Sequence, residues 1–296
     1  MVETLNTAFI DQIKRAVAQS KVSTVITEEN VYQEGNPDIL PILDEMVNHL
    51  ILPKSGLTGL EHLEELYEKS KAGKACLLLV EHYSNLDLSI VSSLVRMAGG
   101  RGKEIGEAII AIAGMKLNED NPVVAAFASA YSRIVIYPSR SLQGLDPEKE
   151  KAENCRCAAI NRAAMKALIR HKYKGSLILV FPSGTRYRSW DPDSKKGVRE
   201  IDSYIRSFDY MCFIALNGQV LHVQKTDMMN DAVTKDVVRV TAGPVVDCQK
   251  FRDEILEKIS GDDKVDKKQA VADEIMKILE KMHNDGETER LKLINS

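Results

Sequence analysis

The 296-residue sequence has no long apolar segment. Its uncharged and mostly apolar stretches, Ala108 to Met115 among them, are all shorter than the roughly 20 residues that a helix needs to cross a membrane. The N-terminus also lacks a basic segment followed by an apolar one, so we expect no secretory signal. These two absences predict a soluble protein.

Cysteine is scarce and follows no metal-binding pattern. The five cysteines are odd in number and include no CxxC pair, and only Cys155 and Cys157 lie close together in the sequence. That pair is too isolated to indicate a zinc site. We therefore expect reduced thiols in a reducing compartment, and neither a bound metal nor a bound cofactor.

Neither sign of charge predominates. The net charge is −3, and charged residues make up 28% of the chain with both signs mixed. This balance argues against a nucleic-acid partner, which would require a broad basic surface. The apolar fraction of 44% is ordinary for a packed globular protein.

Two common enzyme signatures are also missing. No GxGxxG follows an expected strand, which disfavours a dinucleotide-dependent enzyme. Ser183 lacks the flanking glycines of the GxSxG nucleophile elbow, which disfavours a serine hydrolase. The chemistry must therefore come from other motifs.

Short apolar runs alternate with helical patterns along most of the chain. Helical spacing is clearest from Leu88 to Met97 and from Asn154 to His171. The alternation predicts an α/β fold with a mixed, largely parallel sheet flanked by helices on both faces. The expected strands are 75–80, 109–113, 134–137, 177–181, 212–216 and 237–241.

The first 55 residues are predicted to be helical. Apolar residues recur at three-to-four spacing from Phe9 to Val17 and again from Ile39 to Leu50. Pro53 to Gly56 then has the composition of a hinge. We therefore predict a small helical region over residues 1–55 and a functional α/β domain over residues 56–296.

A histidine and an aspartate at HxxxxD spacing follow the first expected strand. His82 and Asp87 lie between the apolar run 75–80 and a helical pattern, at the carboxyl edge where parallel sheets place their sites. Asp87 could hold one ring nitrogen and leave the other as a general base. A second HxxxxD, His222 to Asp227, lacks these flanks, so we interpret His222 as a surface or structural residue.

A second motif, Phe181 to Arg188, also follows an expected strand. Pro182 ends the strand, and Gly184 permits a sharp turn. Arg186 and Arg188 are two residues apart and would point the same way in an extended segment. Two guanidinium groups on one face can hold a phosphate, although a solvated surface pair is the alternative.

Arg140 is a further basic candidate. It follows the expected strand 134–137, so a parallel sheet could bring it to the same rim as the two motifs. An exposed loop arginine is an equal alternative. Lys116, after strand 109–113, is a weaker candidate of the same kind.

With these residues identified, the chain resembles the glycerolipid acyltransferase superfamily, and most closely its soluble, plastid-type glycerol-3-phosphate acyltransferases. The resemblance covers roughly residues 75–222. His82 and Asp87 match the catalytic HxxxxD of the family. Pro182 to Arg188 is similar to the plastid form Pro-Ser-Gly-Gly-Arg-Asp-Arg, whereas membrane-bound relatives more often have Pro-Glu-Gly-Thr-Arg.

Other segments match the family less closely. Arg140 and Ser141 stand at the place of a Lys-His pair that contacts the substrate phosphate, so a serine replaces the family's histidine. Ile112 to Leu117 resembles a strand that ends in Ala-Gly. Cys212 and Phe213 stand where the superfamily often has Val-Pro.

The resemblance implies an acyltransferase that moves a fatty acyl group from an acyl thioester to the sn-1 hydroxyl of glycerol 3-phosphate. The product would be lysophosphatidate, for phospholipid biosynthesis. His82, oriented by Asp87, would be the general base. The implied substrate-binding residues are Arg140, Ser141, Ser183, Gly184, Thr185, Arg186 and Arg188.

The implied donor is a thioester of acyl carrier protein or of coenzyme A, and both are anionic. Two basic clusters could receive it, although a solvated surface is an equal alternative for each. They are Lys195 and Lys196 with Arg199, and Arg96 with Arg101 and Lys103. The expected location is the cytoplasm or the plastid stroma, with at most transient contact with a membrane surface.

Two other functions stay open at this point. The acceptor could be 1-acylglycerol 3-phosphate or another lipid hydroxyl, which would need a wider apolar cleft. A non-enzymatic module that binds a phosphate headgroup would tolerate the loss of His82 and would lose affinity with Arg186.

Overall fold

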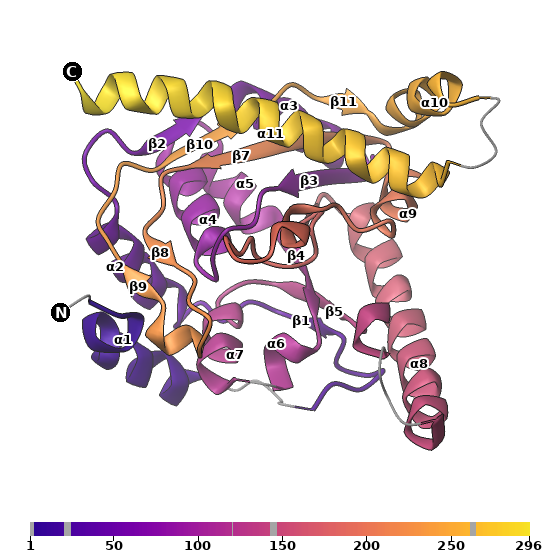
Figure 1. Ribbon diagram of the computed structural model, residues 1–296, viewed down its shortest axis with the longest axis horizontal. Coiled ribbons are helices and arrows are strands. Elements are labelled where there is room, and N and C mark those ends of the chain that lie inside the picture. The colour runs from indigo at the N-terminus through magenta and orange to yellow at the C-terminus, as the bar shows by residue number, and fades with distance from the viewer. Residues whose placement is uncertain (1–2, 21–24, 120, 143–146, 261–264) are drawn as a thin grey trace.

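One nine-stranded sheet runs through the molecule. The computed structural model describes residues 3–20, 25–119, 121–142, 147–260 and 265–296 (Figure 1). The strands are β1 (Tyr32–Gln33), β2 (Gly56–Thr58), β3 (Cys76–Val80), β4 (Ile109–Gly114), β5 (Arg133–Ile136), β6 (Leu177–Val180), β7 (Tyr210–Asn217), β8 (Leu221–His222), β9 (Ala232–Val233), β10 (Arg239–Ala242) and β11 (Val246–Asp247). The strands β8 and β9 form a separate two-stranded sheet.

The helices surround this sheet. They are α1 (Leu5–Gln19), α2 (Leu40–Leu50), α3 (Leu60–Lys71), α4 (Asp87–Met97), α5 (Gly102–Ala108), α6 (Lys116–Glu119), α7 (Pro122–Ala128), α8 (Pro147–Lys172), α9 (Ile201–Ile205), α10 (Cys248–Lys258) and α11 (Lys267–Ile294). The 3-10 turns are η1 (Ser139–Leu142), η2 (Pro192–Lys195) and η3 (Met228–Asn230).

The central strands of the sheet are parallel to one another, and the strands at its margins run antiparallel to them, with the edge strand β2 pairing in parallel with β10. In the order β1-β5-β4-β6-β3-β7-β10-β2, the strands from β5 to β7 all pair in parallel. The strand β1 pairs antiparallel with β5, and β10 and β11 pair antiparallel with β7. This confirms the predicted α/β fold with a mixed, largely parallel sheet.

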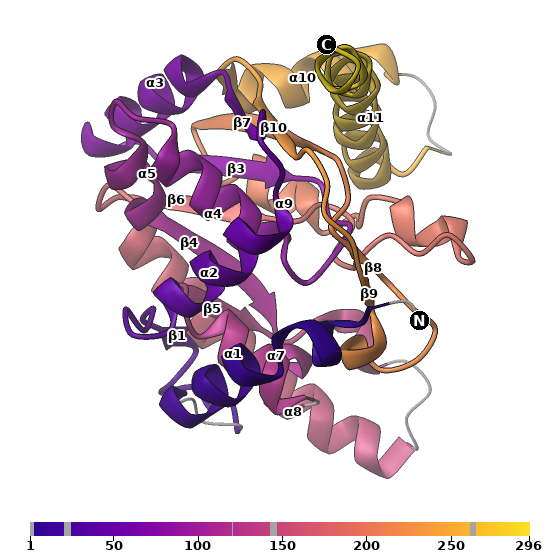
Figure 2. The ribbon, with the colours of Figure 1, turned by 90° about the vertical axis from the view of Figure 1, so that its left-hand side faces the viewer.

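Both faces of the sheet are buried, which explains the continuous apolar runs. All five residues of β3 and all four of β6 are buried, as strands between two helical layers require. One core packs α1–α5 and α7 against the sheet, and a second packs α8–α11 against the opposite face. Figure 2 shows α3, α4 and α5 on one side of the strands and α11 on the other.

The helix α11 lies along β7, which is the strand next to β3. Val271, Ile275 and Leu279 are spaced four apart and fully buried, so one stripe of the helix faces the core. Asp266 caps its start by accepting the backbone N–H groups of Lys268 and Gln269. Of the helices in the described ranges, none is both long and apolar enough to cross a bilayer.

The N-terminal residues pack directly on the rest of the protein. The helix α1 contacts α7, α2 contacts α4, and β1 extends the sheet beyond β5. The two predicted helices are therefore present, together with a short strand that the periodicity did not indicate. A domain boundary at residue 55 stays a prediction.

Candidate active site

The candidate residues follow the carboxyl ends of neighbouring parallel strands. His82 comes two residues after β3, and the segment from Ser183 to Arg188 follows β6, which pairs with β3. Arg140 and Ser141 follow β5, which is three strands away from β3. At a strand spacing of roughly 4.8 Å, that separates their backbones by about 14 Å along the rim.

His82 and Asp87 form a hydrogen-bonded pair. The Nδ1 atom of His82 lies 2.9 Å from Oδ2 of Asp87. Asp87 is the first residue of α4 and is 3% exposed, whereas the His82 side chain is 18% exposed. Because a carboxylate only accepts, Nδ1 carries the proton, and Nε2 is left unprotonated when the ring is neutral.

The turn between the two residues holds the Asp87 carboxylate in place. Its Oδ2 atom accepts the backbone N–H groups of Tyr83 at 2.5 Å and Ser84 at 2.8 Å. Its Oδ1 atom accepts the Ser84 hydroxyl at 2.7 Å. With His82, four donors surround one carboxylate, which fixes the position of the imidazole that it binds.

The segment after β6 contacts the same histidine. The ring of Phe181 stacks on the His82 ring with centroids 4.0 Å apart and planes 17° apart. The backbone N–H of Tyr187 donates to the His82 carbonyl at 2.8 Å. The structure therefore brings the two predicted motifs into direct contact.

Ser183, Gly184 and Thr185 form the predicted turn. Gly184 has φ +61, the left-handed region that favours glycine, and its N–H donates to the carbonyl of Phe181. The buried Ser183 hydroxyl donates to the carbonyl of Thr185 at 2.7 Å. In this structure Ser183 therefore closes the turn.

Arg186 reaches a buried carboxylate that the sequence did not indicate. Its Nη1 atom lies 3.3 Å from Oδ2 of Asp231. Asp231 is fully buried and belongs to the segment that connects β8 to β9. Burial lowers the pKa of Arg186, and the charges of Asp231 and Asp87 partly offset this. Burial also raises the pKa of Asp231. The Arg186 side chain remains 22% exposed, so the guanidinium is accessible from solvent.

Arg188 has a different partner. Its Nη1 atom lies 3.7 Å from Asp191, and the two residues form an isolated β-bridge within a turn. The two arginines lie close enough for their charges to interact, but each faces its own carboxylate. Each guanidinium therefore lies beside a carboxylate, and joint binding of a phosphate by the two arginines stays a prediction.

The other rim candidates contribute less. Ser141 is half-buried, and its N–H donates to the carbonyl of Pro138, the residue before η1. The side chain of Arg140 lies outside the described parts of the structure. Lys116 begins α6 directly after β4 and is exposed, so it stands on the same rim.

The second HxxxxD does not form a comparable pair. The Nε2 atom of His222 lies 2.8 Å from the Thr234 hydroxyl. Asp227 caps η3 by accepting the N–H of Met229 and receives a second bond from Asn121. His222 and Asp227 therefore each have other hydrogen-bond partners, which is consistent with a structural role for His222.

Both basic clusters considered for the donor contain ion pairs. Lys195 faces Glu280 and Lys196 faces Asp193, while Arg199 faces Asp266. In the other cluster, Arg96 pairs with Asp44 in two hydrogen bonds, and Arg101 pairs with Glu68 and Glu104. The pairs of the first cluster are exposed, as expected of a solvated surface, whereas the Arg96–Asp44 pair of the second is mostly buried.

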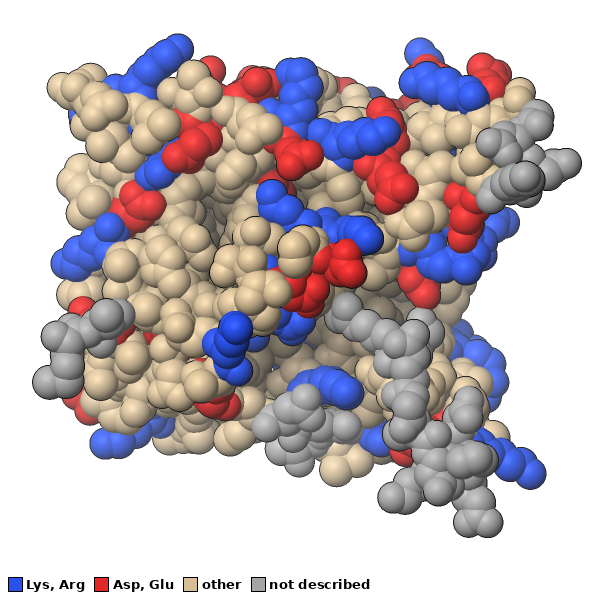
Figure 3. All heavy atoms as spheres, in the orientation of Figure 1, with Lys and Arg blue, Asp and Glu red and all other residues tan. Residues whose placement is uncertain are grey.

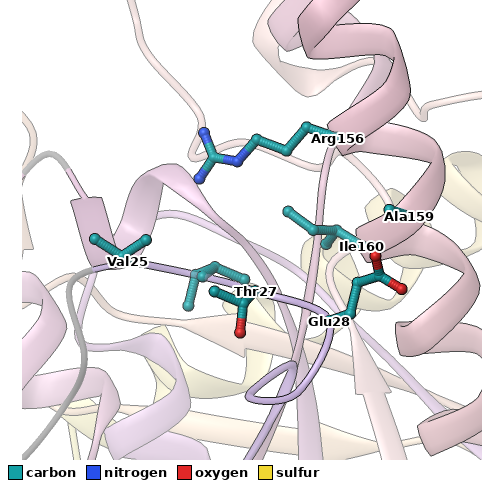
Figure 4. Close-up of a pocket in the computed structure, with 7 residues that line it drawn as sticks. Val25, Thr27, Glu28, Arg156, Ala159 and Ile160 are labelled. Atoms are coloured by element: carbon teal, nitrogen blue, oxygen red, sulfur yellow. The ribbon is translucent and has the colours of Figure 1, made fainter.

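The surface around the segment after β6 carries several cations. Figure 1 draws this segment in the foreground near the middle, and Figure 3 shows Lys and Arg side chains bordering a hollow in that part of the face. An open pocket lies elsewhere, between the chain near Val25 and the helix α8 (Figure 4). It is lined by Val25, Ile26, Thr27, Glu28, Arg156, Ala159 and Ile160, and by none of the predicted site residues.

Sequence reasoning missed three polar residues next to the predicted pair. Asp231 binds Arg186, Glu81 directly precedes His82, and His283 reaches Glu81 from α11. The sequence does indicate Glu81, because it places an acidic residue directly before the motif histidine. Nothing local in the sequence links His283 or Asp231 to the site, because those contacts span about 200 and 45 positions.

Comparisons with known proteins add little to this description. No protein-family model matches the chain, and a search of curated proteins found no match. One similar solved structure is the crystal structure of the 1-acyl-sn-glycerophosphate (LPA) acyltransferase PlsC from Thermotoga maritima. The identity is 14% and the TM-score 0.43, with 83% of this chain and 80% of that chain covered. A similarity of this size carries no argument about activity.

Proposed function

We propose that the protein is an acyltransferase that moves a fatty acyl group from an acyl thioester to a hydroxyl of a glycerol phosphate. The observation that carries the proposal is the His82–Asp87 pair at the carboxyl edge of a parallel sheet, in contact with the segment that bears Arg186. A base beside a cation suits a substrate that has both a hydroxyl and a phosphate.

His82 would act as the general base through Nε2, since Nδ1 is engaged by Asp87. As the substrate oxygen attacks the thioester carbonyl, its proton passes to Nε2. The tetrahedral intermediate then collapses, the C–S bond breaks, and the imidazolium returns the proton to the leaving thiolate. Asp87 stabilises the positive ring during both steps.

Arg186 would hold the substrate phosphate. It is partly exposed and already opposed by Asp231, so an incoming dianion would compete with one buried carboxylate for the same guanidinium. Arg188 lies close enough to add its charge, and Arg140 and Ser141 are further candidates along the rim. Fixing the phosphate fixes the distance from the substrate hydroxyl to the base.

We propose the sn-1 hydroxyl of glycerol 3-phosphate as the acceptor, giving 1-acylglycerol 3-phosphate. The motif from Pro182 to Arg188 supports this choice, because it is similar to the soluble glycerol-3-phosphate enzymes. The donor would be a thioester of coenzyme A or of acyl carrier protein. The same base and cation would also serve 1-acylglycerol 3-phosphate, so this lipid is the second acceptor to test.

The test is a transfer assay with defined substrates. Purified protein is incubated with an acyl-coenzyme A or an acyl carrier protein thioester and with glycerol 3-phosphate, 1-acylglycerol 3-phosphate or glycerol. Lysophosphatidate from the first acceptor supports the proposal, and phosphatidate from the second alone would reassign the acceptor. Thioester release that does not depend on any acceptor would indicate a hydrolase instead.

A further inference from the structure

A buried carboxylate links the His82 turn to the C-terminal helix. Glu81 is 7% exposed, and its backbone N–H still pairs with the carbonyl of Ile214 on β7. Its Oε2 atom then accepts the N–H of Leu216 at 2.8 Å. The carboxylate thus takes the place of a backbone carbonyl at the point where β3 stops and the chain turns towards His82.

Tyr83 and His283 complete this cluster. The Tyr83 hydroxyl donates to Oε1 of Glu81 at 2.9 Å. The Nδ1 atom of His283, on α11, lies 3.0 Å from Oε2 of Glu81 and 3.1 Å from the Tyr83 hydroxyl. Since Glu81 only accepts, His283 donates through Nδ1. Tyr83 also donates its backbone N–H to Asp87, so the cluster and the His82–Asp87 pair share one residue.

The helix α11 approaches this point unusually closely. A Cβ atom at Gly286, one turn after His283, would lie 2.3 Å from Oδ1 of Asn217. The side-chain amide of Asn217, the last residue of β7, donates to the carbonyl of His283 at 2.8 Å. A glycine inside a helix costs stability, and here it permits the close approach.

We infer that His283 is a positioning residue, which acts through Glu81 and Tyr83 to hold the turn that orients His82 and Asp87. This inference rests on the proposed function for its kinetic consequences, but its geometry does not depend on which substrate is used. Through His283, the helix α11 would contribute to the site, although it begins about 180 residues after the His82–Asp87 motif.

The charge of His283 gives the arrangement a pH dependence. Burial lowers its pKa, but the hydrogen bond and the charge of Glu81 outweigh this and raise the pKa above 6.5. Lys195 lowers the pKa and Glu287 raises it further. Among the described residues, these two and Glu81 act on the charge of the ring, and the Tyr83 hydroxyl contacts it. The stabilisation from the charged ring is complete below pH 6.5 and is lost as pH rises through the raised pKa.

The kinetic test compares three variants on the same helix. His283→Ala should lower kcat about tenfold, the loss expected for one buried hydrogen bond to a charged group, with little change in the KM of the acceptor. His283→Asn keeps a donor near the Nδ1 position, so it should recover most of kcat. Because asparagine does not titrate, this variant should also lack the fall in kcat that the wild-type protein is expected to show at alkaline pH. Lys281→Ala is the control, because Lys281 is exposed and, within the described part of the chain, forms its ion pair with Asp285 on the same helix.

Gly286→Ala tests the same link without altering any charge. The added methyl group would meet Asn217 and push α11 away from β7, so kcat should fall as it does in His283→Ala. Wild-type kcat and an unchanged pH profile in His283→Ala, with only a lower melting temperature, would overturn the inference. That result would leave His283 with a purely structural role.

A measurement without substrate separates this inference from the proposed function. NMR of histidine-labelled protein should show the His82 Nδ1 proton in its hydrogen bond to Asp87, and His283→Ala should weaken or remove that signal. If the wild-type protein shows no transferase activity and His283→Ala still weakens the His82 signal, the proposed function is contradicted and the inference is supported. An unchanged signal in His283→Ala would contradict the inference whatever the activity.

Discussion

Asp87→Asn separates the charge of the carboxylate from its shape. In the native turn, Oδ2 of Asp87 accepts from His82, Tyr83 and Ser84, and Oδ1 accepts from the Ser84 hydroxyl. An asparagine can keep its oxygen at the Oδ2 position and place its amide nitrogen at Oδ1. The Ser84 hydroxyl can then accept instead of donating. The turn should therefore survive the substitution.

The loss in rate should come from the missing charge. During transfer, the imidazolium of His82 would face the carboxylate across the 2.9 Å contact, with charge centres about 4 Å apart. At an effective dielectric constant of about 20, that attraction is worth about 4 kcal/mol. Because each 1.36 kcal/mol corresponds to roughly a factor of ten, kcat should fall by about 10²- to 10³-fold.

The assay is thioester release with saturating donor and varied acceptor, with the melting temperature measured in parallel. Asp87→Ala serves as the contrast, since it leaves the donors of Tyr83 and Ser84 unpaired and should cost about 1–3 kcal/mol for each buried group. A folded Asp87→Asn protein with kcat within about threefold of wild type would refute the electrostatic reasoning.

Two further predictions concern the phosphate and the fold. Arg186→Ala should raise the acceptor KM by about 10- to 100-fold, and Arg188→Ala should raise it less, because Arg186 is the more buried of the two. Equal increases in the acceptor KM of the two variants, measured by steady-state kinetics, would contradict the assignment of Arg186 as the main phosphate-binding residue. Gly59→Ala should unfold at a clearly lower denaturant concentration than Gly73→Ala. Both glycines have φ near +80, but only at Gly59 would a Cβ clash, 2.2 Å from the carbonyl oxygen of Ala242. If the two variants unfold at the same denaturant concentration, then backbone strain alone, about 1–2 kcal/mol, determines how much each substitution lowers the free energy of unfolding.

The central strands were predictable because each is buried on both faces. Residues 76–80 and 177–180 are buried throughout, as are residues 109–111 of β4, and all lie within or next to apolar runs. The short edge strands β1 and β2 were not predictable, because two or three residues show no periodicity. Their pairing depends on partners such as Ile134 and Val240 that are distant in sequence.

The candidate site divides in the same way. The His82–Asp87 pair was predictable because both residues belong to one turn, where sequence spacing determines the distance between them. The partner of Arg186 was not, because Asp231 belongs to a separate hairpin, β8–β9, that folds against the segment after β6. Arg186 and Arg188 were expected to point the same way, and the structure adds a carboxylate partner for each, Asp231 and Asp191, that their spacing did not indicate. Binding of one phosphate by both arginines stays a prediction.

The role of His82 as the general base is tested by the transfer rate of His82→Ala beside that of His222→Ala. Both variants remove the histidine of an HxxxxD sequence, but only His82 has its aspartate within hydrogen-bond distance among the described contacts. We expect His82→Ala to lose at least about 10²-fold in kcat, whereas His222→Ala should stay close to wild type. Equal rates in the two variants, with both proteins folded, would contradict this role.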